Sequence, residues 1–102
     1  MGVKARQVTL DEIIGSVCAA CGVQREDLIA AGRGRQAAEA RSMVALVVQE
    51  ERGITITEAA RVFRRDTSSL TAGAARLRAK LDGDEVLRHR LAEVKAGLRI
   101  PQ

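Results

Sequence analysis

Aromatic residues are almost absent from this chain of 102 residues, which contains one Phe and neither Trp nor Tyr. The core must therefore be built from Leu, Ile, Val, Ala and Met. Proline occurs once, at Pro101, so no proline interrupts a helix before the last residues. This length, together with an abundance of Ala, Arg and Glu, predicts a single all-α domain, a compact bundle of about six helices.

Side chains that could perform catalysis or bind a metal are scarce. The only histidine is His89, which we expect to be an exposed helix residue. Cys18 and Cys21 form a CxxC pair, but a structural zinc site needs four ligands and no other Cys is present. We interpret both cysteines as small buried hydrophobes. No GxxxxGK phosphate loop occurs, so we predict no enzyme, no catalytic residue, no metal, no cofactor and no small-molecule substrate.

Long apolar runs are also missing. No run approaches the roughly 20 residues that span a bilayer, and residues 1–9 lack the apolar segment of a signal peptide. We therefore predict no membrane partner and a cytoplasmic location. Residues 1–8 are interpreted as a flexible lead-in, residues 9–98 as the folded domain and residues 99–102 as a tail.

Charge is unevenly distributed along the chain, whose net charge is +4. Residues 9–31 carry four acidic side chains and one basic one, whereas residues 61–81 carry six basic side chains and one acidic one. Positive charge clustered on one element is expected of a protein that binds a polyanion. A solvated basic helix without a partner is the alternative.

Capping patterns and apolar periodicity predict where the helices lie. Thr9 with Glu12, and Thr55 with Glu58, form capping boxes that begin two of them. Gly22 is well placed to end the first helix in a left-handed conformation. The predicted helices span about residues 10–21, 23–31, 36–52, 56–63, 67–81 and 85–98.

The third predicted helix should be the buried centre of the bundle, because it is apolar almost all round between Met43 and Val48. Arg41, near its start, is the exception, and we expect it to point to solvent or to a ligand. The fourth and last helices should supply core contacts from Ala59, Ala60, Val62, Phe63, Val86, Leu87, Leu91, Val94 and Leu98.

The predicted helix at residues 67–81 has two distinct faces. Apolar side chains recur at helical spacing at Leu70, Ala74, Leu77 and Leu81. Small side chains form the opposite face at Ser68, Ala72, Ala75 and Ala79. Cations flank this small face at Arg64, Arg65, Arg76, Arg78 and Lys80.

A short helix, a tight polar turn and a longer basic helix form the helix-turn-helix pattern, in which the second helix enters the DNA major groove. There are three alternatives. The helix could be merely solvated, with alanines that favour helicity. Its small face could contact a partner protein, or the domain could bind structured RNA.

The segment Gly32-Arg33-Gly34-Arg35 is predicted to be a basic loop, because it has two glycines in three residues and two arginines. Such a loop can insert Arg into a narrow groove or lie along phosphates. An ordinary polar connector is the alternative.

Several short motifs follow one another in a recognisable order. They are Val8-Thr9-Leu10-Asp11-Glu12-Ile13-Ile14, Arg33-Gly34-Arg35, Ala40-Arg41, Glu58-Ala59-Ala60 and Arg65-Asp66-Thr67-Ser68-Ser69-Leu70. The last is similar to the signature Gly-Gly-Arg-Asp-His-Thr-Thr-Val. Over about residues 8–98 the chain resembles the C-terminal duplex-binding domain of the bacterial replication initiator DnaA, and equally the DnaA-like domain of REP-associated transposases.

This resemblance implies a six-helix domain that binds double-stranded DNA sequence-selectively, associated with the bacterial nucleoid. In this resemblance, the signature positions contact bases and bind phosphates. They are Arg65, Asp66, Thr67, Ser68 and Ser69. Arg33 matches the arginine that enters the minor groove, and Arg35 and Arg41 match backbone contacts. The predicted DNA-binding set is completed by Arg64, Ala72 and Arg76.

The chain departs from the signature at base-reading positions. Arg64 replaces Gly-Gly with one residue fewer, Thr67 replaces the His, and Ala72 replaces a second His of the initiator. The initiator's target sequence is therefore not expected, and the changes favour the transposase-associated branch. The chain is then the DNA-targeting part of an initiator or transposase, with an ATPase or catalytic domain as its partner, or a free-standing relative.

Overall fold

The computed structural model describes residues 8–29, 34–51 and 53–98. These residues form six helices and no strand, which confirms the predicted all-α bundle. The helices are α1 (Leu10–Cys21), α2 (Arg25–Ile29), α3 (Arg35–Glu50), α4 (Ile56–Phe63), α5 (Thr67–Leu81) and α6 (Glu85–Leu98). The predicted bounds of α1, α4, α5 and α6 are confirmed, whereas α2 begins two residues later than predicted. Helix α3 begins one residue earlier than predicted and ends two residues earlier, at Glu50. The predicted end of α2, at residue 31, lies outside the described residues.

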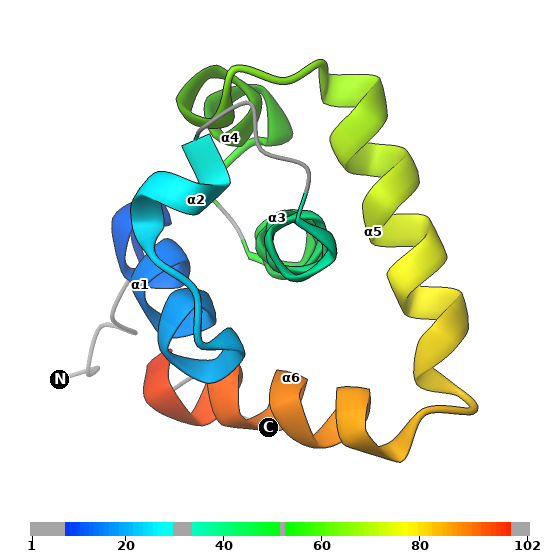
Figure 1. The fold of residues 1–102 in the computed structure, drawn as a ribbon. Helices are drawn as coiled ribbons and strands as arrows, with labels where there is room; N and C mark the ends of the chain where they lie inside the picture. The colour runs from blue at the N-terminus through cyan, green and yellow to red at the C-terminus, as the bar shows by residue number, and fades with distance from the viewer. Residues whose placement is uncertain (1–7, 30–33, 52, 99–102) are drawn as a thin grey trace, which may run out of the picture.

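Helix α3 is the centre of the bundle, as predicted. Viewed end-on in Figure 1, it is surrounded by the other five helices. It packs against α1, α2, α4 and α5, and every residue from Met43 to Val48 is buried. An apolar surface on all sides of one helix requires neighbours on all sides, and this arrangement provides them.

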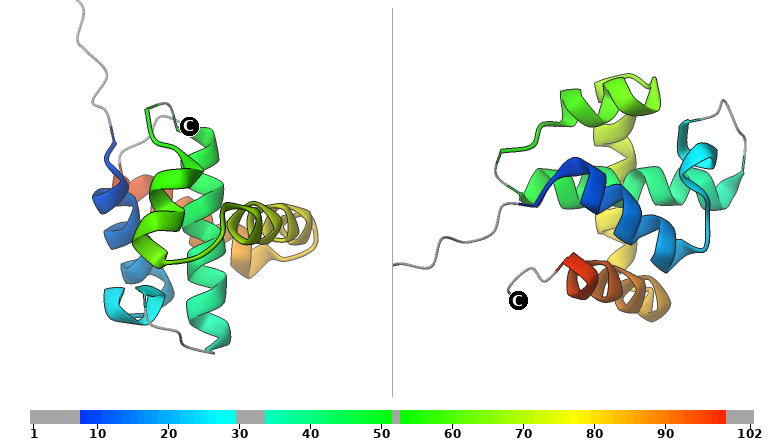
Figure 2. Two further views of the ribbon diagram at one scale, coloured as in Figure 1. Left: turned by 90° about the horizontal axis from the view of Figure 1, so that it is seen from above. Right: turned by 90° about the vertical axis from the view of Figure 1, so that its left-hand side faces the viewer.

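Helix α5 crosses α3 and turns one face outward, as the two views in Figure 2 show. Its inner face buries Leu70, Gly73, Ala74 and Leu77. The predicted small face is exposed at Ser68, Ala72, Ala75 and Ala79. Packing against α3, α4 and α6 therefore holds α5 at the edge of the bundle with its small side chains directed to solvent.

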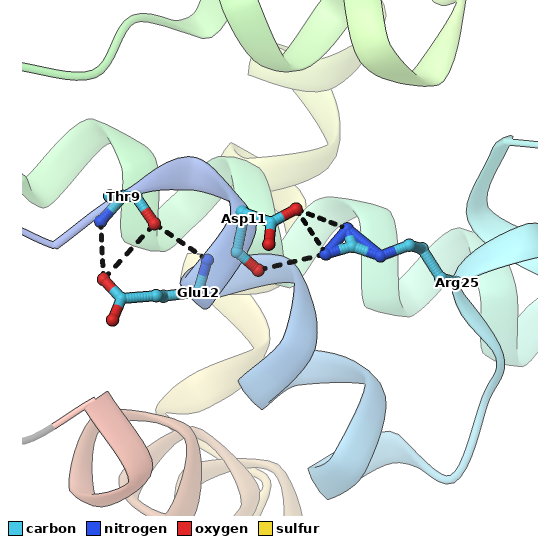
Figure 3. Close-up of polar contacts among 4 residues, drawn as sticks. All are labelled: Thr9, Asp11, Glu12 and Arg25. Carbon is cyan, nitrogen blue, oxygen red and sulfur yellow. Dashed lines mark hydrogen bonds and ion pairs between the residues drawn. The ribbon is translucent and has the colours of Figure 1, made fainter.

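Side-chain caps define the starts of α1 and α4. The Thr9 hydroxyl accepts a hydrogen bond from the Glu12 backbone N–H (3.1 Å), and the Glu12 carboxylate accepts one from the Thr9 N–H (3.0 Å; Figure 3). Thr55 and Glu58 form the same reciprocal pair at α4. Arg25 donates to the Asp11 carboxylate at 2.6 Å and so connects α2 to the start of α1.

Two predicted core residues are exposed instead. Val62 on α4 is 38% exposed and Val86 on α6 is 67% exposed. Each is adjacent in sequence to a buried residue of its own helix, Phe63 or Leu87, and helical geometry directs neighbouring side chains to different sides. His89 is exposed, as expected, and Cys18 and Cys21 are partly buried free thiols.

Candidate nucleic-acid interface

The connection from α4 to α5 consists of three residues, Arg64, Arg65 and Asp66. Helix α4 ends with hydrogen bonds from the Arg64 N–H to the Arg61 carbonyl (3.3 Å) and from the Arg65 N–H to the Ala60 carbonyl (3.0 Å). This is the Schellman arrangement, which places one residue in the left-handed region and usually employs glycine there.

Arg64 occupies that left-handed position, with φ 56° and ψ 47°. Among the described residues it is the only non-glycine with positive φ. A side chain in this conformation costs roughly 1–2 kcal/mol. The Arg64 side chain therefore places a cation at the turn at the expense of backbone strain.

The start of α5 is rich in exposed polar side chains that the fold does not use. Asp66 is the N-cap residue by its backbone, yet its side chain makes no capping hydrogen bond. Thr67, Ser68 and Ser69 follow and are also exposed. Asp66 thus differs from Thr9 and Thr55, whose side chains cap the N-termini of their helices with hydrogen bonds.

Arg65 is half-buried at the same connection. Its guanidinium donates a hydrogen bond to the Phe63 carbonyl at 3.1 Å. The side chain therefore supports the turn between the two helices as well as lying beside the start of α5.

The expectation that Arg41 points to solvent or a ligand is wrong, because this side chain is only 9% exposed. Its guanidinium donates to the carbonyls of Leu28 (3.2 Å) and Asp27 (3.5 Å), at the end of α2. Carbonyls at a helix C-terminus lack intrahelical partners and carry partial negative charge, which attracts the cation inward. Burial lowers the pKa of Arg41, and the nearby positive charge of Arg65 lowers it further.

Two of the cations predicted beside the small face are directed towards the core helix. Arg78 lies 4.0 Å from Glu50, and Lys80 lies 3.8 Å from Glu39, both on α3. The same two glutamates hold cations of α6, since Glu39 pairs with Arg90 at 3.0 Å and Glu50 with Lys95 at 2.9 Å.

The basic loop before α3 is described only at its end. Arg33, the predicted minor-groove residue, lies outside the described residues. Arg35 is the first residue of α3 and is exposed. It lines an open cleft of about 340 Å³ between α3 and α5, together with Arg76 and Lys80 of α5. The described end of the loop and α5 therefore lie on one side of the molecule.

This cleft is not among the features predicted from the sequence. The available signal was Gly73, a glycine inside a helix pattern on the core-facing side. Such a residue often marks a close approach of two backbones. The partner helix, however, cannot be read from a local pattern.

A scan against protein-family models finds no match to this chain, and a search of curated proteins also finds none. Within the described ranges, no group of three or more His, Cys, Asp or Glu side chains is placed to hold a metal ion. Across those same residues, every helix is too short or too polar to cross a membrane.

Proposed function

We propose that this domain binds double-stranded DNA sequence-selectively, with α4 and α5 as a helix-turn-helix. Helix α5 would lie in the major groove and the loop containing Arg33 in the adjacent minor groove. One observation carries this proposal: the 15 residues of α5 include no acidic side chain and present an exposed face of Ser and Ala. A face of small side chains can approach the edges of bases closely.

Electrostatics and hydrogen bonding have separate roles in this proposal. Contacts of Arg64 and Arg76 with phosphates supply affinity without sequence information. Ser68 and Ser69 can donate to or accept from base edges, and the Asp66 carboxylate can accept from cytosine N4. These side chains form no hydrogen bond within the described part of the chain, so contact with bases requires no rearrangement of the fold.

The resemblance to the DnaA duplex-binding domain supports the same proposal through the order of its motifs. It also suggests a wider role as the DNA-targeting module of an initiator or a transposase, joined to an ATPase or catalytic domain and associated with the nucleoid. Arg41 is not retained as a DNA contact, because its guanidinium is buried against α2.

The decisive experiment is selection of bound fragments from a random duplex library, followed by affinity measurements on the selected sequence at several salt concentrations. Replacing Arg65 with Ala should weaken binding by roughly 1–3 kcal/mol if the guanidinium makes a bidentate base contact. Arg33→Ala should weaken binding to targets with a narrow minor groove. Unchanged affinity in both variants would exclude the proposed docking.

A protein-interaction module is the second candidate, because the same exposed alanines could pack against a partner helix. Ala72→Glu separates the two. If α5 enters DNA, the variant loses duplex binding and keeps its oligomeric state. If the face is a protein interface, the variant dissociates a complex instead. Competition between duplex DNA and duplex RNA tests the third candidate, binding of structured RNA.

A further inference from the structure

We infer that the cleft between α3 and α5 is a binding site for one phosphate group. We assign this group to a phosphodiester of the DNA backbone beside α5. That assignment rests on the proposed function. The cleft is defined by Arg35, Ser42, Arg76 and Lys80, with Glu39 also in its lining.

Polar groups without partners converge on this cleft. The side chains of Arg35, Ser42 and Arg76 form no hydrogen bond or ion pair with any described residue. Two guanidinium groups and a hydroxyl can all donate hydrogen bonds to the oxygens of a phosphate. A phosphate would therefore satisfy groups that the protein leaves to solvent.

Gly73 opens the space in which these donors meet. The Ser42 hydroxyl and the Arg76 guanidinium both lie within 4 Å of the position that a Cβ atom at Gly73 would occupy. A Cβ atom here would clash with the Ser42 hydroxyl and force it to shift, whereas its distance of 3.8 Å from the Arg76 guanidinium is ordinary contact. The donors thus come from two different helices and reach one place because of this glycine.

Glu39 does not cancel the positive charge of the cleft. Its carboxylate is bound by Arg90 of α6 at 3.0 Å, from outside the cleft lining. It also attracts Lys80 at 3.8 Å and so keeps that ammonium at the cleft. With the Glu39 charge neutralised by Arg90, Arg35, Arg76 and Lys80 remain to attract an anion.

The test compares the salt dependence of duplex binding in wild-type protein, Arg76→Gln, Arg35→Gln, the double variant and a matched control. Arg78→Gln is the control, because Arg78 is also an arginine of α5 but lies near Glu50 and does not line the cleft. The three substituted positions are all exposed, and circular dichroism checks that the helices are retained in the four variants.

If one phosphate is held jointly, the double variant loses about 0.9 from the slope of log affinity against log salt, the value for a single phosphate. Arg78→Gln should keep the wild-type slope. Wild-type slopes in the double variant would overturn the inference. A decrease of about 1.8 in the slope would also overturn it, since that is the value for two separate phosphates.

Titration with inorganic phosphate at constant ionic strength separates this inference from the proposed function. Saturable shifts of the backbone amide signals of Ser42 and Gly73, absent from the Arg35→Gln/Arg76→Gln variant, would support a phosphate site even if no duplex is bound. Absence of such shifts in a wild-type protein that binds no duplex would overturn both. If the protein binds duplex DNA, the double variant keeps the wild-type salt slope and phosphate causes no amide shifts, only the phosphate site in the cleft is refuted.

Discussion

The hydroxyl of Ser42 on α3 occupies space that a Cβ atom at Gly73 on α5 would need. Glycine inside a helix is unfavourable by about 1 kcal/mol relative to alanine. At this crossing the absence of a side chain lets the two helices approach closely. A contact between one serine and one glycine therefore sets how near α5 lies to the central helix.

This contact predicts that the effects of Ser42→Ala and Gly73→Ala on stability are coupled. With the hydroxyl present, the new methyl group meets it and the gain in helix propensity is offset. In a Ser42→Ala background the nearest remaining side-chain atom lies at 3.4 Å, and Gly73→Ala should stabilise the fold by about 1 kcal/mol. Urea unfolding of the four proteins measures the coupling, and equal effects of Gly73→Ala in both backgrounds would contradict it.

Arg64→Gly should separate stability from DNA affinity. Glycine removes the roughly 1–2 kcal/mol cost of the left-handed conformation but gives more freedom to the unfolded chain, which opposes the gain by about 0.5–1 kcal/mol. The free energy of unfolding should therefore stay the same or rise by up to about 1.5 kcal/mol. Duplex affinity should fall, because a cation at the turn is lost. Arg64→Lys is the control, and it should keep both the strain and most of the affinity.

Asp66→Ala should leave stability nearly unchanged, because the Asp66 side chain makes no capping hydrogen bond. Thr55→Ala is the matched comparison at α4, where the capping box is complete. It should cost about 0.5–2 kcal/mol. Thermal or urea unfolding gives both values. A loss of stability in Asp66→Ala as large as in Thr55→Ala would show that Asp66 has a structural role in place of a DNA-reading one.

Arg41→Ala should destabilise the fold by about 1–3 kcal/mol, since it removes the donor that satisfies the Leu28 carbonyl at the end of α2. Arg35→Ala, at an exposed position on the same helix, should change stability by less than about 0.5 kcal/mol. Denaturant unfolding compares them. If Arg41 acted only as a surface contact for DNA, its replacement would leave the unfolding curve where it is.

The thiols of Cys18 and Cys21 should react slowly with alkylating agents in the folded protein. Burial raises the pKa of both above the ordinary value of 9.0, so less thiolate is present at a given pH. A pKa that is raised in the folded state also makes the free energy of unfolding depend on pH. The contribution of the two neutral thiols to stability is complete below pH 9 and declines as pH rises through the folded pKa. Rates of iodoacetamide reaction against pH, compared with those in guanidinium chloride, check the shift. Identical profiles in the two conditions would refute it.

Local patterns in the sequence were sufficient for the number and order of the helices and for both ends of α1, α4, α5 and α6, but not for the start of α2 or the ends of α3. Capping boxes at Thr9 and Thr55, the left-handed Gly22 and the apolar run from Met43 to Val48 all have their predicted roles. Each depends on interactions within a few residues or on periodicity along one helix, so the sequence by itself determined them.

The directions of individual side chains were decided only by tertiary structure. Arg41 turns inward because the end of α2 lies beside it, and Val62 and Val86 stay exposed because no helix covers them. Arg35 and Arg76 are 41 positions apart in the chain, yet they line one cleft because α5 crosses α3 near Gly73. That crossing arises from the packing of helices distant in sequence, and helical periodicity carries no information about which faces will meet.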